Sequence, residues 1–216
     1  SRSTGRVGLD LKYGLTSNLT LNATVNPDFG QVDADPATVN LTAYETFFEE
    51  RRPFFVEGGG IFSLVSPGNI PVSGPQLLYS RRIGRAPQGS PVYRGSGSFT
   101  DMPQSTTILG ATKLSGRLAG GWSLGLLEAV TGREFAAVDS AGVRFRDEVE
   151  PMTNFAALRA MRDFGKTEDG SSNTLGFMGS AVHRRIGSPR LDFLRTGAYA
   201  GGVDFVHRFS RTRYIA

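Results

Sequence analysis

The sequence predicts an all-β protein: part of an antiparallel transmembrane β-barrel of the outer-membrane type, with a long plug-like insertion. Three observations carry this prediction. Apolar and polar residues alternate in runs of about nine residues, glycine makes up 28 of the 216 residues, and most of the prolines are concentrated in one segment. Strands that cross a bilayer need ~9–11 residues, whereas soluble strands commonly have ~5–6. We therefore expect residues 1–216 to be a single β-barrel region and a fragment of a longer chain.

The first two strands are expected to form a β-hairpin. In residues 6–14, Val7, Leu9, Leu11 and Tyr13 alternate with polar residues or glycine, and the same alternation returns in residues 18–26. A period of two places the apolar side chains of a strand on one face. About four glycine or polar residues separate the two runs, which is typical of a hairpin connection.

Residues 27–106 are predicted to be an irregular, proline-rich insertion that lies in the lumen or caps it. The segment holds nine of the eleven prolines, and proline cannot donate a hydrogen bond inside a sheet, so a run of central strands is excluded. One short helix is expected near residues 41–49, where Leu41, Tyr44 and Phe48 recur at helical spacing after Asn40, which can cap a helix. Long irregular connections in compact domains commonly serve as lids, plugs or constrictions.

Five further strands are predicted at residues 107–117, 121–132, 153–164, 174–184 and 195–209. The spacing in residues 153–164 also fits a helix, and we assign a strand there because its neighbours are strands. In the last run, glycines at positions 197, 201 and 202 stand where a curved sheet can bend. No run of 18 apolar residues occurs, so the sequence predicts no transmembrane helix.

The composition excludes several classes of chemistry. The chain has no cysteine, which removes thiol catalysis, disulfide scaffolds and cysteine-ligated zinc. Of its 24 basic residues only Lys12, Lys113 and Lys166 are lysines. Surfaces that bind nucleic acid normally mix in many lysines, whereas the planar fork of arginine holds carboxylates in fixed networks. We therefore expect no nucleic-acid partner, and the sequence indicates no cofactor.

The densest group of reactive side chains lies in residues 45–57. It contains the carboxylates Glu45, Glu49, Glu50 and Glu57 together with Arg51 and Arg52. In an enzyme, two of these carboxylates would be the acid and base of a glycosidase, which stand ~5–9.5 Å apart. The alternative is a network of arginines and carboxylates that pins the insertion against the barrel wall. The alternative is favoured because the adjacent residues 49–52 can pair with one another.

Two other clusters of charged residues call for an interpretation. Arg81, Arg82 and Arg85 are interpreted as a basic patch that faces the lumen and contacts an anionic substrate or the glutamates of residues 45–57. Asp28, Asp33 and Asp35 are candidate ligands of an oxygen-coordinated cation, but they lack the EF-hand pattern. Ordinary capping of turns by aspartate is the preferred interpretation of these three residues.

Six blocks in order resemble the domain of unknown function family 5916: NPDFGQVDADPATVNLTAYETFFEERRPFFVEGGGIF, LLYSRRIGR, ILGATKLSGR, GGWSLGLLEAVT, EPMTNF and GGVDFVHRF. The resemblance implies a barrel in the outer membrane of a Gram-negative bacterium. It also implies an upstream domain similar to carbohydrate-binding family 9, for which full-length members are often labelled carbohydrate-binding or hydrolase-like. No catalytic residue is established for the family region, so none is carried over.

The expected function is that of a non-enzymatic outer-membrane barrel, linked to the binding or uptake of a carbohydrate or another polymer and in contact with membrane lipid. One alternative is a glycoside hydrolase-like enzyme that uses the carboxylates of residues 45–57. The other is a soluble β-sandwich that binds a ligand. The sequence leaves the oligomeric state open.

Overall fold

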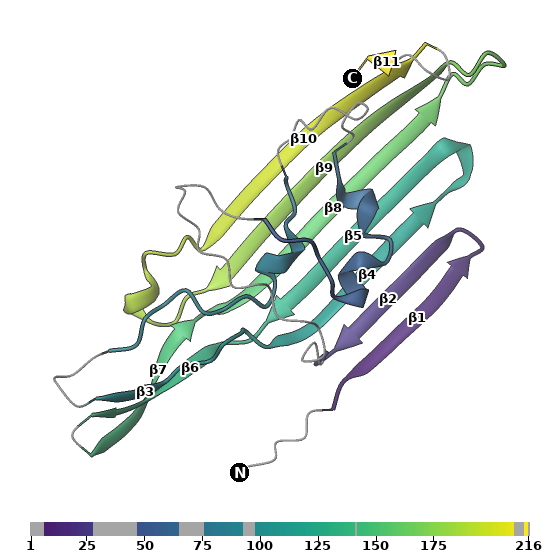
Figure 1. The fold of residues 1–216 in the computed structure, drawn as a ribbon. Coiled ribbons are helices and arrows are strands. Elements are labelled where there is room, and N and C mark those ends of the chain that lie inside the picture. Colours follow the sequence, from purple (N-terminus) through teal and green to yellow (C-terminus); the bar gives the residue numbers. More distant parts are fainter. Residues whose placement is uncertain are drawn as a thin grey trace.

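The protein is mostly β, with antiparallel sheets. A computed structural model describes residues 7–27, 47–64, 76–92, 98–140, 142–209 and 214–215. Eight strands form one long curved sheet in the order β1-β2-β4-β5-β8-β9-β10-β11 (Figure 1). Their bounds are β1 Leu9–Thr16, β2 Leu19–Val25, β4 Ile108–Arg117, β5 Trp122–Thr131, β8 Met152–Phe164, β9 Ser172–Arg185, β10 Gly197–Arg208 and β11 Tyr214–Ile215.

The seven strands predicted from alternation are confirmed, including the ambiguous run that became β8. Each strand pairs in antiparallel fashion with the next strand of the sheet, for example Leu11 with Ala23 and Leu126 with Leu158. The connections differ in length at the two ends. At one end they comprise residues 17–18, 118–121 (which contain the short helix η3, Ala119–Gly121) and 165–171. At the other end they comprise residues 26–107, 132–151 and 186–196, the last with the short helix η4 (Pro189–Leu191).

A second, three-stranded sheet was not predicted. It has the order β3-β6-β7 and consists of β3 (Phe99–Asp101), β6 (Glu134–Ser140) and β7 (Val143–Glu150). This sheet extends beyond the end with long connections and does not stack face to face on the large sheet (Figure 1). The described part of the expected irregular insertion thus contains one strand, β3, which lies at a sheet edge, where nearby prolines are tolerated.

Residues 47–64 and 76–92 of the insertion are called the inserted segment. It contains the helix α1 (Pro53–Val56) and the 3₁₀ turns η1 (Gly59–Phe62) and η2 (Ser80–Arg82). Residues 41–46 of the expected helix lie outside the described residues, and residues 47–50 are not helical. The helix begins instead at Pro53, whose fixed φ suits the first helical position and disfavours helical backbone just before it.

The hydrophobic core lies between the inserted segment and one face of the large sheet, which we call the covered face. Phe55, Phe62 and Ile83 of the segment pack against six residues from four strands: Ile108, Ala111, Leu127, Ala129, Ala157 and Met178. At Gly125 the absence of a side chain makes this contact possible. A Cβ atom there would lie 2.7 Å from Ile61 and 3.1 Å from the Phe62 ring.

The opposite face of the large sheet, called the open face, carries large apolar side chains that nothing described covers. Tyr199 is 79% exposed and Val203 71% exposed. The same face of the other strands presents Leu9, Leu11, Tyr13, Val25, Leu126, Leu158, Leu175, Phe177 and Phe205, each at least 37% exposed. The sheet therefore has apolar side chains on both faces, in the core on its covered face and bare on its open face, whereas the outer face of a sheet in water is usually polar.

Within the described residues, no helix is long and apolar enough to cross a membrane.

Candidate functional site: two cavities beside helix α1

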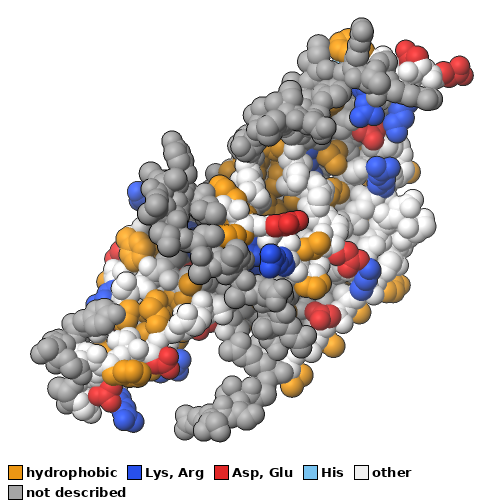
Figure 2. Space-filling view, viewed as in Figure 1, with side chains coloured by type: hydrophobic (Ala, Val, Ile, Leu, Met, Phe, Trp, Pro, Cys, Tyr) orange, Lys and Arg blue, Asp and Glu red, His pale blue; other side chains and the backbone are white. Residues whose placement is uncertain are grey.

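Two cavities lie against the covered face, one on each side of α1. The first, called the Asp10 cavity, has a volume of about 340 Å³ and is lined by β1, β2 and α1 through Asp10, Leu11, Lys12, Asn22, Ala23, Pro27, Pro53, Phe54 and Glu57. The second, called the Glu50 cavity, has about 400 Å³ and lies between α1, η1 and residues 76–80, above Lys113 and Leu127. Seen from this side, charged side chains of both signs gather near the middle of the molecule (Figure 2).

Glu50 has both carboxylate oxygens occupied. Arg52 donates from Nε to Glu50 Oε1 at 2.8 Å and from a terminal nitrogen to Oε2 at 2.7 Å, and Ser80 Oγ donates to Oε2 at 2.6 Å. Burial by itself raises the pKa of Glu50, but the hydrogen bonds from Arg52 and Ser80 outweigh it and lower this pKa from 4.5 to about 2. Glu50 is therefore ionised and fully engaged at neutral pH.

The same arginine joins the two parts of the inserted segment. Arg52 also donates to the carbonyl oxygens of Ile83 at 2.6 Å and Ser80 at 2.8 Å, and its guanidinium lies 4.3 Å from the centre of the Phe55 ring. Tyr79 adds a second link, because its hydroxyl accepts a hydrogen bond from the Phe48 N–H at 2.9 Å. These contacts make residues 47–64 and 76–92 one packed unit.

Lys113 fastens this unit to the sheet. The residue belongs to β4, is only 1% exposed, and donates from Nζ to the carbonyl oxygens of Phe54 and Glu57. These carbonyls lie at the C-terminal end of α1, where a helix has unsatisfied acceptors and favours a cation. The ammonium group also lies 4.9 Å from the centre of the Phe54 ring.

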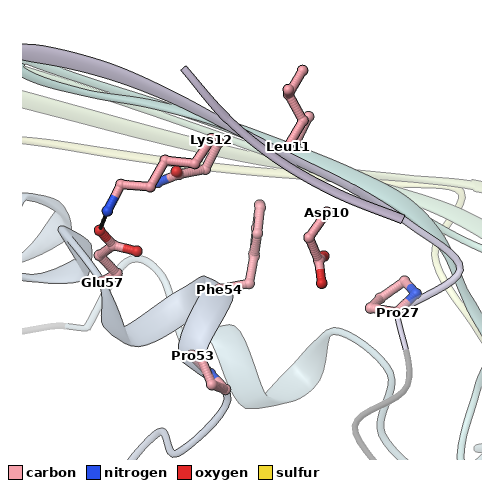
Figure 3. Close-up of a pocket in the computed structure, with 9 residues that line it drawn as sticks. Asp10, Leu11, Lys12, Pro27, Pro53, Phe54 and Glu57 are labelled. Atoms are coloured by element: carbon pink, nitrogen blue, oxygen red, sulfur yellow. Dashed lines mark hydrogen bonds and ion pairs between the residues drawn. The ribbon is translucent and has the colours of Figure 1, made fainter. Parts of the chain in front are cut away.

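The second lysine contact lies at the edge of the Asp10 cavity. Lys12 of β1 forms an ion pair with Glu57, and both side chains are more than half exposed. The hydrogen bond from Lys12 lowers the pKa of Glu57 below its ordinary value. In Figure 3, Lys12 and Asp10 point from β1 toward α1, the Phe54 ring points toward them, and Leu11 points to the other side of the strand.

Three polar side chains in and beside this cavity have no partner among the described residues. Asp10 and Asn22 line the cavity without a hydrogen bond of their side chains, although Asn22 is only 8% exposed. Thr24, which pairs with Asp10 across the hairpin, is 2% exposed, and its hydroxyl has no partner. Asp10 is exposed, and of these three side chains only that of Thr24 has a fully buried atom without a partner, which is rare for a buried polar group.

A further charged pair lies on the covered face, toward the last strands. Arg159 of β8 is 0% exposed and forms a two-pronged ion pair with Asp204 of β10. Gly176 of the intervening strand β9 leaves room for it, because a Cβ atom at that position would lie 2.5 Å from Asp204 Oδ1 and 2.7 Å from Arg159. The pair therefore connects two strands that are not neighbours.

The predicted site residues are partly brought together. Glu49 and Glu50 line the Glu50 cavity, and Glu57 lines the Asp10 cavity on the other side of α1. Arg81 donates to the Glu49 carbonyl oxygen at 2.9 Å. Arg51, Arg82 and Arg85 do not line either cavity. Glu45 and the three candidate cation ligands Asp28, Asp33 and Asp35 lie outside the described residues, and the residues that are described hold no group of three or more potential metal ligands.

Sequence reasoning did not find Asp10, Lys12, Asn22 or Lys113. The sequence does carry a signal for the two lysines. The chain has only three lysines among its 24 basic residues, and two of them occupy strand positions whose side chains point to the covered face. Both of these lysines contact the inserted segment.

The chain belongs to the family described as Domain of unknown function (DUF5916), whose family profile matches residues 1–169. The block at residues 201–209, used above for the resemblance, lies beyond the matched residues. No curated protein and no solved structure matches the chain.

Proposed function

We propose that this member of the DUF5916 family is part of a non-enzymatic transmembrane β-barrel in a bacterial outer membrane. The inserted segment lies in its lumen as a plug, and the barrel serves the passage or surface handling of a carbohydrate or another polymer. The observation that carries the proposal is the bare apolar face of the large sheet. This open face is mostly apolar, with Glu128 as a charged exception, while the covered face holds Lys113 and Arg159 at 1% and 0% exposure beside its apolar core. Membrane barrels alternate in this sense, with apolar side chains outward and polar ones inward.

The length of the apolar band supports the proposal. On the open face of β9, the polar residues Asn173 and His183 flank Leu175, Phe177, Gly179 and Ala181. Ten residue steps at ~3.3 Å span ~33 Å along the strand, or ~25 Å across a bilayer at a strand tilt of ~40°. The apolar band of outer-membrane barrels is ~25 Å tall. Short turns at one end of the sheet and long connections at the other are also typical of these barrels.

The hydrolase alternative loses support from the electrostatics. The general acid of a glycosidase needs a raised pKa, so that it carries a proton at neutral pH. The pKa values of Glu50 and Glu57 are both lowered by their basic partners. The β-sandwich alternative requires a second sheet stacked on the open face, and the described second sheet lies elsewhere (Figure 1).

Single cysteines test the proposal directly, because this region has none of its own. Val203→Cys places a thiol on the open face, and Val143→Cys places one on β7 of the small sheet; the native side chains are 71% and 63% exposed. In intact outer membranes a water-soluble maleimide should label Cys at 143 and spare Cys at 203, because a thiol in hydrocarbon does not ionise. After detergent denaturation both should react. Equal labelling in membranes, or recovery of the native protein in the soluble fraction, contradicts the barrel.

A further inference from the structure

The Asp10 cavity has unsatisfied hydrogen-bonding groups that packing alone does not explain. Asn22 is more than nine-tenths buried, lines the cavity and has no partner for its amide among the described residues. The amide atoms are not fully enclosed, so a molecule in the cavity can reach them. The neighbouring Thr24 hydroxyl is fully buried and unpaired, which costs ~1–3 kcal/mol. A ligand in the cavity would supply the partners that the protein does not give to Asn22.

The polar groups around the cavity include both donors and acceptors. Asp10 offers only acceptors, the Asn22 amide offers both kinds, and the Lys12 ammonium keeps protons beyond the one directed at Glu57. Lys12 and Glu57 neutralise each other, and Asp10 gives the lining a formal net charge of −1. An ammonium ligand would use only the acceptors and would leave the N–H groups of Asn22 and Lys12 without an acceptor. A neutral molecule with several hydroxyl groups, each a donor and an acceptor, uses all of them.

The remaining walls are apolar. Phe54 presents its ring between the polar side chains of β1, and Pro27 and Pro53 lie on either side of it (Figure 3). A pyranose ring has C–H groups on one face and hydroxyl groups at its edge, so it matches an aromatic wall bordered by polar side chains. The volume of about 340 Å³ lies at the small end of the range for small-molecule sites.

We propose that the Asp10 cavity binds one hexose unit, with Asn22 and Asp10 holding its hydroxyl groups and Phe54 contacting its C–H face. The inference rests on the proposed function, in which the covered face lines the lumen and a sugar reaches the cavity from there. Lys12 and Glu57 form the edge of the site, and α1 positions Phe54 and Glu57 relative to the hairpin of β1 and β2.

The test uses the full-length protein in detergent and the methyl glycosides of glucose, galactose and mannose. Saturation-transfer difference NMR should show transfer to ring C–H protons of at least one glycoside. Asn22→Leu and Asp10→Asn should each weaken binding by about fivefold or more, the effect of one lost hydrogen bond of ~1 kcal/mol. The matched control is Asn18→Leu, an exposed asparagine of the same hairpin that does not line the cavity.

Asn22→Leu also separates a binding role from a structural one. Because the amide has no protein partner, its replacement by an apolar group of similar volume should leave the unfolding temperature unchanged or higher. Transfer to none of the three glycosides, or equal transfer in the parent and Asn22→Leu, overturns the site. Binding of n-butylammonium without glycoside binding also overturns it. The labelling of cysteines at 203 and 143 decides the barrel independently of these results.

Discussion

Lys113→Met should loosen the inserted segment far more than Lys12→Met. Methionine keeps the aliphatic stem of the lysine but cannot donate to the carbonyls of Phe54 and Glu57. A hydrogen bond to a charged group contributes ~1.5–3 kcal/mol, and the two bonds share one ammonium group, so we take a loss of ~3 kcal/mol. At 1.4 kcal/mol per tenfold change, the undocked population should rise ~100-fold. Lys12, in an exposed ion pair, should contribute at most ~1 kcal/mol, or ~5-fold.

A single cysteine beneath the segment measures this population. Ala157 of β8 is 5% exposed and belongs to the core that the segment covers, and Ala157→Cys adds only one sulfur atom. When reclosing is fast, the maleimide labelling rate is proportional to the open population. The rate should therefore rise ~100-fold with Lys113→Met and at most ~5-fold with Lys12→Met. Equal acceleration by the two variants, or none by Lys113→Met, refutes the assignment of Lys113 as the anchor.

Three further predictions concern the other charged groups. Gly176→Ala should lower the unfolding temperature strongly because its Cβ would meet the Arg159–Asp204 pair, while Gly179→Ala on the same strand, with its nearest atom at 3.6 Å, should not. Asp204→Ala should lower the free energy of unfolding, measured with denaturant, by ~3–5 kcal/mol, because it leaves Arg159 buried without a partner. Adding Arg159→Met should recover much of this loss. A double variant less stable than Asp204→Ala contradicts the prediction. The pKa of Glu50 is lowered from 4.5 to about 2, so its contribution to the stability of the inserted segment is complete above pH ~4.5 and disappears as the pH falls through ~2. Pepsin cleavage of residues 47–64, corrected with a denatured control, should therefore increase in that window in the parent. It should not increase in Glu50→Gln.

The large sheet was predictable because alternation is a local property. Each of its long strands carries its own period of two, and neighbouring strands follow each other along the chain. The small sheet gave a weaker signal. In β6 the consecutive residues Ala136 and Ala137 interrupt the apolar pattern, and a bulge lies between Glu134 and Phe135. Its burial comes from segments far away in sequence, such as Gly89, whose N–H binds the Val149 carbonyl.

The candidate site was predictable only in part. Glu50 and Arg52 are two positions apart, so their pairing follows from the sequence. That pair joins parts of the inserted segment to each other, and a network that pins the insertion against a barrel wall stays a prediction. Lys113 binds backbone carbonyls more than 50 residues away. The rarity of lysine marks Lys113 itself, but its partners have no signature, because every residue carries a carbonyl. The neighbours Lys12 and Asn22 follow from the hairpin register, but nothing local reveals that α1 lies over them.

The two faces of the sheet bear on whether a plug can move. In water, the bare apolar face would be unfavourable at ~25 cal/mol per Å². In the proposed barrel, lipid covers the first face and the lumen lies beside the second. Undocking the inserted segment then exposes Lys113 to lumenal water, which replaces the lost carbonyls. The contribution of Lys113 to the cost of opening is thereby limited to the difference between those partners, ~3 kcal/mol. Separating Phe55, Phe62 and Ile83 from the sheet adds the cost of exposing the core, so a polymer in the lumen opens the plug only by binding the undocked state correspondingly more tightly.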